Sequence, residues 1–572
     1  MLYIGVNAMQ WKNCNEWMPT DGFILEDAAM LVATSNTNKL VMAGPGSGKT
    51  ELLAQRASFL LETNSCINPQ KILAISFKKD AALNLKDRVE KRCGKELVSR
   101  FDSMTFDAFA KSLLDRFMNG LPTNIKPNKN YDIGQNSENN GGSILSFLAI
   151  SKLATEIIRT NPMIKKSLQL TYSHIFLDEF QDTTSVQYEL IKACFLDSKA
   201  VFTAVGDSKQ RIMLWAGARK TVFDDYLSDF KATKDILLMN HRSAPRLVEI
   251  QKAMYANLNE KETDIHPSPK WDNQMGEAYL RFFDDEYAET DVLCNEIADL
   301  IKNGIKPSDI CILVKQTVDA YSENIIKRLE ISGIRARNET VYQDLLKEEI
   351  VKILALIFIL TVPKSNPHAW RYINNFFCEI ESLDENSKAE EFVRIENELS
   401  EMILTFSKNI DDITDVEIFN QNIDIILDKL SYDRLAAMFP EFKNKAYYLK
   451  IISDFKRLLW MEYLVSNDWK VAVDNFMGEN SIPIMTIHKS KGLEYHSVFF
   501  IGLEDSAFWN FKNQPDEDKC TFFVALSRAK ERVDFTFCSS RKTRFTDKQS
   551  NKKINELYEM LAKTGLVEEI CH

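Results

Sequence analysis

The first residues that could do chemistry form a glycine-rich stretch between an apolar run and a helical pattern. Ala43-Gly-Pro-Gly-Ser-Gly-Lys-Thr50 completes KLVMA (39–43) and precedes ELLAQRASFLLE (51–62). Glycines let backbone N–H groups curl around phosphate oxygens, and the N-terminus of the next helix favours an anion. Lys49 would reach the β- and γ-phosphates, and the Thr50 hydroxyl would ligate Mg²⁺. The stretch predicts a nucleoside triphosphate site lined by Gly44, Pro45, Gly46, Ser47, Gly48, Lys49 and Thr50.

A pair of carboxylates ends another apolar run. Asp178 and Glu179 follow HIFL (174–177). Asp178 is placed to hold Mg²⁺, and Glu179 is placed to orient and polarise an attacking water. An Asp-Glu pair at a strand end is more often a solvated tip, so this assignment depends on the glycine-rich stretch. Together the two features predict Mg²⁺-dependent hydrolysis of a nucleotide.

Short apolar runs separated by helical patterns must position these residues. Runs of this length are typical of buried parallel strands in an α/β sheet, with polar tips at the carboxyl ends where such sheets bind ligands. The runs are KLVMA (39–43), ILAISF (72–77), HIFLDEF (174–180), AVFTAVGD (200–207), DICILVK (309–315), IPIMTIH (482–488) and SVFFIG (497–502). By contrast, residues 119–143 predict a loop or subdomain surface, and 346–475 predict helices.

Composition excludes several classes of protein. The chain has 572 residues, a net charge of -11, 45% hydrophobic and 27% charged residues, which is the balance of an ordinary globular protein. An acidic chain needs a local channel to hold nucleic acid. The ten cysteines form no C-x-x-C pair, which favours thiols in a reducing cytoplasm. We expect no signal peptide at the N-terminus, and the apolar stretch 350–362 is too short to span a membrane.

Further motifs follow in a fixed order and carry a resemblance to a known family. They are ISFKKDAA (75–82), TFDAFA (105–110), DEFQD (178–182), VGDSKQRIMLWAGA (205–218), LMNHRS (238–243), MTIHKSKGLE (485–494) and VALSRAK (524–530). With the glycine-rich stretch, this order resembles the UvrD/Rep/PcrA branch of superfamily 1 DNA helicases. The resemblance runs from about residue 25 to residue 530.

The resemblance implies roles for single residues around ATP. Gln210 is similar to the family glutamine that senses the γ-phosphate. Arg242 and Arg528 resemble the two arginines that reach the γ-phosphate, and a planar guanidinium suits charge on the transferring oxygens. Glu494 is similar to the glutamate that holds the ribose hydroxyls. Glu51 stands where an arginine that stacks on adenine is usual.

The resemblance also implies a track for single-stranded DNA, with departures. Phe77 and Trp215 match base-stacking aromatics, and Thr105 and His488 match positions near the strand. The bland interpretation of Phe77 is core packing. An aromatic residue and an arginine of the family are replaced by Met213 and Ala216, and a histidine by Asp107. His241 replaces a tyrosine, and no glutamine lies in the segment before the glycine-rich stretch.

The implied fold is α/β, with two RecA-like P-loop NTPase domains and largely helical insertions. We expect the first domain at 1–235, with a small insertion at about 112–170. The second would comprise 236–345 and 476–572, on either side of a helical insertion at 346–475.

The implied activity is ATP-dependent translocation from 3′ to 5′ on single-stranded or partly duplex DNA, with unwinding, driven by hydrolysis of ATP with Mg²⁺. The alternative is a DNA-sensing ATPase subunit of an anti-phage defence complex of the Gabija type. Such a subunit would regulate a separate nuclease partner and unwind little. A non-catalytic scaffold is disfavoured, because the residues assigned to ATP hydrolysis are all present.

Overall fold

The structure is a computed structural model that describes residues 11–129, 131–134, 144–258, 264–361, 366–383, 387–543 and 546–572. The chain divides into two compact units. The first unit comprises Met1–Glu286 and Ser490–His572, and the second comprises Tyr287–Lys489. The unit with two segments is therefore built from both ends of the chain.

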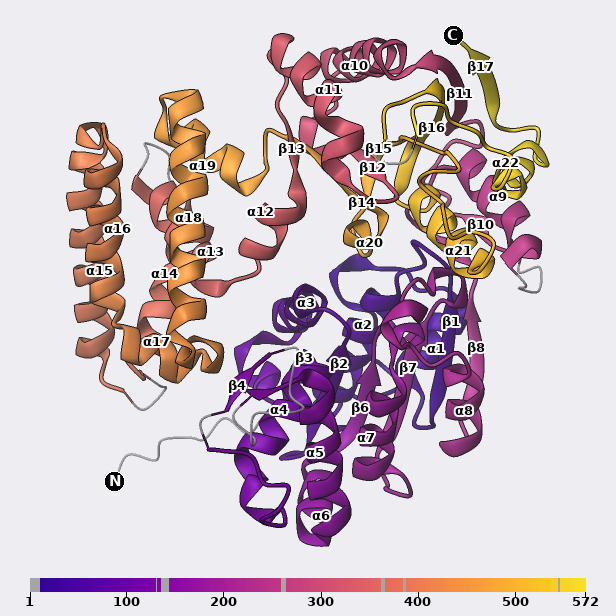
Figure 1. Cartoon of the computed structure of the whole chain (residues 1–572). Helices are drawn as coiled ribbons and strands as arrows, with labels where there is room; N and C mark the ends of the chain where they lie inside the picture. Colours follow the sequence, from indigo (N-terminus) through magenta and orange to yellow (C-terminus); the bar gives the residue numbers. More distant parts are fainter. Residues whose placement is uncertain are drawn as a thin grey trace, which may run out of the picture. The chain divides into compact units, whose positions relative to one another are not determined.

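A six-stranded parallel sheet forms the N-terminal half of the first unit (Figure 1). Its order is β3 (Phe101–Thr105), β2 (Lys71–Ser76), β6 (Tyr172–Leu177), β7 (Val201–Gly206), β1 (Lys39–Ala43) and β8 (Thr233–Leu237). Because all the strands are parallel, the residues that follow them meet at one edge. The glycine-rich stretch follows β1, and Asp178 and Glu179 follow β6.

Helices cover both faces of this sheet. One face packs against α1 (Asp27–Thr34), α2 (Lys49–Glu62) and α3 (Lys79–Val98). The other packs against α4 (Phe106–Phe117), α5 (Phe147–Thr160), α7 (Ser185–Phe195) and α8 (Val222–Asp229). Successive strand residues alternate between the two cores, because side chains on a strand point to opposite faces. In β2, Leu73 joins the second core and Ala74 the first.

Helix α2, which begins in the phosphate loop, is enclosed along most of its length. Every residue from Glu51 to Leu61 is buried. The segment before α1 contributes Trp17, which is 3% exposed and packs edge-on against Phe59 at 5.3 Å between ring centroids. The Trp17 indole N–H donates to Glu62 Oε2 at 2.9 Å. The N-terminal segment therefore holds the helix that carries Lys49 and Thr50.

A second group of parallel strands completes the first unit. In order, these are β15 (Tyr495–Phe500), β16 (Ala529–Ser540), β11 (Glu277–Asp285) and β17 (Glu568–Cys571). Helices α9 (Pro245–Met254), α21 (Pro515–Leu526) and α22 (Asn555–Ala562) belong to the same part. Strand β11 lies between two strands from the C-terminal segment, so residues far apart in sequence form one layer.

The second unit is mainly helical. Strands β13 (Ala336–Asn338), β14 (Ile482–Thr486) and β12 (Ile310–Val314) pair in parallel, accompanied by α10 (Glu286–Lys302), α11 (Val318–Ile331) and α12 (Glu339–Leu345). The helices that follow share one apolar core: α13 (Glu349–Thr361), α14 (Pro367–Ile380), α15 (Ala389–Asn409), α16 (Val416–Leu430), α17 (Tyr432–Met438), α18 (Lys445–Ser466) and α19 (Trp469–Met477). Figure 1 shows α16 running alongside α18, and the two helices are in contact.

These elements confirm the predicted α/β fold class, and each of the seven apolar runs contains a strand. In the described residues of the stretch 346–475, most of the chain is helical. Residue 130 and residues 135–143 of the predicted loop at 119–143 lie outside the described residues, as do residues 1–10 of the N-terminus. In the described part of the chain, no helix is both long enough and apolar enough to cross a membrane.

Candidate active site

The phosphate loop between β1 and α2 depends on two glycines with positive φ. Gly46 has φ +69°, and a Cβ built there would lie 2.4 Å from Asn240 Oδ1. Gly48 has φ +78° and forms the N-cap of α2. The His241 backbone N–H donates to the Gly46 carbonyl at 2.8 Å. Only glycine fits such a close approach, so the segment around Asn240 packs directly on the loop.

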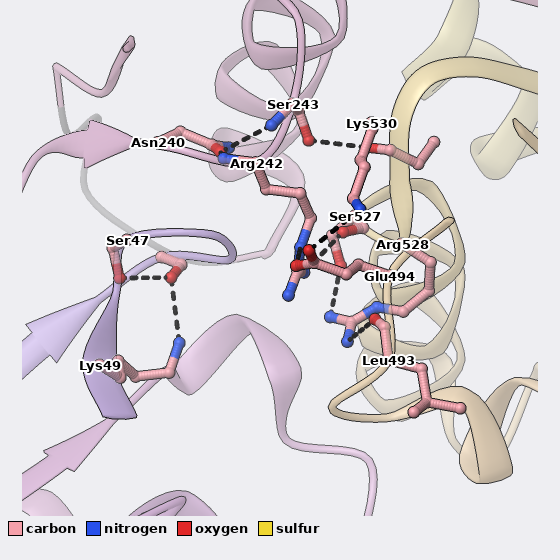
Figure 2. Close-up of polar contacts among 12 residues, drawn as sticks. Ser47, Lys49, Asn240, Arg242, Ser243, Leu493, Glu494, Ser527, Arg528 and Lys530 are labelled. Carbon is pink, nitrogen blue, oxygen red and sulfur yellow. Dashed lines mark hydrogen bonds and ion pairs between the residues drawn. The ribbon is translucent and has the colours of Figure 1, made fainter. Parts of the chain in front are cut away.

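Lys49 projects into the same loop. Its Nζ donates to the carbonyls of Ala43 at 3.1 Å and Gly44 at 3.0 Å. Burial lowers the pKa of Lys49, and the carboxylates of Glu179 and Asp207 oppose that shift. Figure 2 shows the Lys49 ammonium on the inner side of the loop. A partly buried cation in a glycine-rich loop at a helix N-terminus can hold the negative charge of a triphosphate.

Thr50 and Asp178 together make a possible magnesium site. The Thr50 hydroxyl donates to Asp178 Oδ2 at 3.5 Å, and Asp178 is 3% exposed. Burial and the neighbouring Glu179 raise the pKa of Asp178 to about 7. A hydroxyl and a carboxylate beside a triphosphate site are the oxygen ligands that Mg²⁺ prefers. The donor set therefore fits the ion that the sequence predicted.

Glu179 has an unusual backbone conformation, with φ 49° and ψ 42°. Its Oε2 accepts from Gln181 Nε2 at 2.5 Å and lies 3.9 Å from Lys491 Nζ. Burial opposes ionisation of Glu179, but Lys491 and Lys49 outweigh it and lower the pKa of this carboxyl. A non-glycine residue in the left-handed region carries strain that often marks a functional site. Glu179 is thus an ionised carboxylate held in one orientation.

Gln210 connects several of the predicted residues. Its Nε2 donates to Asp207 Oδ2 at 2.9 Å, and its Oε1 accepts from Arg528 Nη2 at 3.0 Å. Its backbone carbonyl accepts from Lys491 Nζ, also at 3.0 Å. Gln210 is 3% exposed, so these bonds form in a poorly hydrated site. Changes at Arg528 can therefore reach the turn that bears Gln210.

The two arginines of the prediction meet near the end of α21. Arg242 Nε donates to Glu494 Oε2 at 2.8 Å and its Nη1 to the Ser527 carbonyl at 2.9 Å (Figure 2). Arg528, which is 1% exposed, donates to the carbonyls of Val524 and Leu493. Burial, reinforced by Arg242, lowers the pKa of Arg528 to about 9.

Glu494 balances part of this positive charge. Besides Arg242, its carboxylate contacts Lys530 Nζ at 3.2 Å. Burial opposes its ionisation, but Arg242 and Lys530 lower the pKa of Glu494. Glu494, predicted to bind the ribose, therefore forms an ion pair with Arg242, predicted to bind the γ-phosphate.

Glu51 is enclosed by cations from another helix. Its carboxylate accepts from Arg88 Nη1 at 2.9 Å, Arg92 Nη2 at 2.7 Å and Gln55 Nε2 at 2.9 Å. A Cβ on Gly48 would lie 3.8 Å from Glu51 Cβ and 3.9 Å from the His241 ring. Glu51 and His241 thus flank the start of α2, and two arginines offset the charge of Glu51.

The residues predicted to contact DNA lie in different places. Phe77 is partly buried directly after β2, and Thr105 ends β3, whose last pair is Ser76 with Thr105. The Thr105 hydroxyl accepts from the Ala108 N–H at 3.1 Å and so caps α4. Trp215 is 69% exposed in a short 3-10 helix, Leu214–Ala216.

His488 lies in α20 (Ile487–Ser490) and belongs to the second unit. The structure therefore brings together the residues predicted for ATP, and places Phe77 beside Thr105.

Lys491 is the main residue that sequence reasoning missed. Its side chain is 4% exposed, and its ammonium contacts Asp182 as well as Gln210 and Glu179. Lys491 lies inside the motif MTIHKSKGLE, where only His488 and Glu494 had been assigned roles. The position of Lys491 between His488 and Glu494 in the same motif was the sequence signal that could have identified it.

Together, the loop, the acidic pair and the two arginines define a P-loop nucleoside triphosphatase. The sequence model described as "UvrD/REP helicase N-terminal domain" matches residues 26–140 and 128–231. The model described as "UvrD-like helicase C-terminal domain" matches residues 236–430 and 402–540. The chain belongs to the UvrD/Rep helicase family.

Three relatives are similar over most of their length. The ATP-dependent DNA helicase PcrA of Staphylococcus aureus is 23% identical, over 89% of this chain and 82% of its own. A probable DNA helicase II homolog of Mycoplasma capricolum is also 23% identical, over 89% and 83%. The ATP-dependent DNA helicase Rep of Buchnera aphidicola is 24% identical, over 89% and 94%.

Proposed function

We propose that this chain is an ATP-dependent DNA helicase that moves from 3′ to 5′ along single-stranded DNA and unwinds the duplex ahead of it. Family membership supports the helicase class. The observation that carries the ATPase part is the grouping of Lys49, Glu179 and Arg528 around one phosphate loop. We expect the protein to act in the cytoplasm on single-stranded or partly duplex DNA.

In this proposal, the side chains divide the work of hydrolysis. Lys49, Arg242 and Arg528 place positive charge around the phosphoryl group as it is transferred, which is the largest contribution that a protein makes to this reaction. Glu179 accepts the proton of the attacking water and orients that water. Mg²⁺ held by Thr50 and Asp178 would neutralise charge on the β- and γ-phosphate oxygens.

Gln210 would change its contacts when the γ-phosphate is bound or lost, and so affect the residues bonded to it. It bonds to Arg528 through its side chain and to Lys491 through its backbone. The loop that follows Gln210 carries Trp215, whose exposed ring offers a platform for a base. Hydrolysis and strand binding would thus act on one short segment.

The test combines ATP turnover with strand displacement. Turnover is measured with Mg²⁺, with and without a single-stranded oligonucleotide, and displacement is measured on matched duplexes with either a 3′ or a 5′ tail. We expect DNA to stimulate turnover several-fold and only the 3′-tailed duplex to be unwound. The variant Lys49→Ala should lose both activities and is the control for contaminating enzymes.

Two outcomes would change the proposal. Stimulated turnover without displacement of either duplex would favour the DNA-sensing ATPase subunit that regulates a separate nuclease in anti-phage defence. The replacements Met213 and Ala216 in the loop that carries Trp215 are the sequence features in favour of that alternative. Turnover that does not respond to DNA would contradict both.

A further inference from the structure

A second lysine links the catalytic turn to the loop after β2. The Lys78 ammonium donates to the backbone carbonyl of Lys491 at 2.8 Å. Lys78 is the N-cap of α3 and directly follows Phe77, a residue proposed to contact the strand. The two loops are separated by 413 positions in sequence, so only the fold brings them together.

Lys491 is held at both ends. Its carbonyl accepts from Lys78, while its buried ammonium contacts Asp182, the Gln210 carbonyl and Glu179. Asp182 is fully buried and ends the turn that begins at Glu179. A displacement of the Lys491 backbone would therefore move the cation that positions this turn.

The bond from Lys78 is one that a DNA strand can replace. A phosphodiester carries a full negative charge, so it attracts the Lys78 ammonium as an ion pair, whereas the Lys491 carbonyl offers only a dipole. Lysines that bind a strand do so through its phosphates. A DNA strand bound at Phe77 would place a phosphate close to Lys78, the next residue. The phosphate and the Lys491 carbonyl would then compete for the Lys78 ammonium.

The residue after Lys491 has open space beside it. Gly492 follows with φ +93°, and a Cβ built on it would have nothing within 4 Å, so the backbone has room at that point.

We infer that Lys78 is a positioning residue that couples strand binding to ATP turnover. Without DNA, Lys78 holds Lys491 in the position that restrains the turn of Glu179 and Gln210. With DNA, a phosphate takes Lys78, and the turn moves to the arrangement that hydrolyses ATP. This inference rests on the proposed function, because it requires DNA-stimulated turnover.

The test measures basal turnover and stimulated turnover at saturating oligonucleotide for wild type and Lys78→Ala. We expect the basal rate of Lys78→Ala to rise at least threefold while the stimulated rate stays within about twofold of wild type. Lys78→Arg keeps a cationic donor and should show the wild-type ratio of stimulated to basal turnover. The control Lys79→Ala removes the same charge from the next, exposed residue and should leave the basal rate unchanged.

The two possible failures can be told apart. If wild-type turnover does not respond to DNA, the proposed function fails. If wild type responds but the basal rate of Lys78→Ala does not rise, the inference alone is overturned. A thermal melt of each variant shows whether it is folded, and Lys78→Arg tests the inference if Lys78→Ala is not.

Discussion

Glu179 combines an ionised carboxylate with a strained backbone, which suits a general base that must hold one orientation. The change Glu179→Gln keeps the size of the side chain and a hydrogen-bond acceptor but removes the basic site. We expect nucleotide binding to be kept and turnover to fall by about 10² to 10⁴. Steady-state ATPase assays and binding of a fluorescent nucleotide check this. Glu189→Gln, in a half-buried position on α7, should behave as wild type, and near-normal turnover of Glu179→Gln would remove its assigned role.

Arg242 and Arg528 are the two arginines that the resemblance assigns to the γ-phosphate. Each change to alanine should lower turnover by on the order of 10² or more, with a smaller effect on nucleotide affinity, if the guanidinium acts on the transition state. Lysine should not restore activity, because it lacks the planar fork of donors. Equal losses of affinity and of turnover would instead indicate ground-state binding or misfolding.

The surroundings of Glu51 bear on the choice of base. Glu51 brings a negative charge to the place where an arginine is usual in the family, and Arg88 and Arg92 offset that charge. Glu26 lies in the segment where the family has a glutamine, and its carboxylate accepts from the Leu238 N–H at 3.2 Å. We expect ATP and GTP to differ by no more than about tenfold in kcat/KM, since one hydrogen bond contributes roughly 1–2 kcal/mol.

Measurement of kcat/KM for the two nucleotides decides the question of base selection. A preference for ATP of about 10³, some 4 kcal/mol, would contradict weak discrimination. In that case Arg88→Ala, at the more exposed of the two arginines, would show whether this cluster recognises the base.

At the scale of elements, strands were predictable where both faces are buried. Strands β1, β2, β6 and β7 are continuous apolar runs, and the sequence located each of them. It missed β8, in which only Leu237 is buried, and β16, which begins with charged residues. β8 lies at the edge of its sheet and β16 has charged residues near its start, so neither shows a continuous apolar run, although both pair with neighbouring strands.

The contacts between elements were less predictable than the elements. The predicted ATP residues came from short motifs, each with its own local signal. Arg88 and Arg92 lie 37 and 41 positions from Glu51, and Lys78 lies even farther from Lys491. No local pattern signals such pairs, because only the packing of α3 and the C-terminal segment creates them.

Gly46 offers a test of the packing between the loop and its neighbours. The change Gly46→Ala adds a Cβ in the left-handed region and against Asn240, whose Oδ1 accepts from the N–H groups of Arg242 and Ser243. We expect nucleotide affinity to fall at least tenfold and the melting temperature to drop. The control Gly565→Ala has a similar φ of +61° but open space around it, so it should show only the backbone cost of about 1–2 kcal/mol. Equal effects of the two changes would contradict a role for this close contact.

At the scale of the whole molecule, the net charge of -11 requires DNA to be held by a few local cations. For about four neutralised phosphates, affinity for a single strand should fall about 50-fold between about 50 and 200 mM salt. Fluorescence anisotropy of a labelled oligonucleotide measures this slope. Trp215→Ala should weaken binding without changing the slope, because stacking releases no counterions. Affinity that does not depend on salt would contradict electrostatic binding.

The position of β11 between β16 and β17 has a consequence for synthesis on the ribosome. The N-terminal sheet can form early, because its strands all precede residue 240. β11 must wait for β16 and β17, which are translated later, and the same later segment brings Glu494 and Arg528. A nascent chain thus carries a phosphate loop well before it carries the arginine that completes the site. The enzyme becomes competent to consume ATP only after the segment that carries Arg528 has been translated.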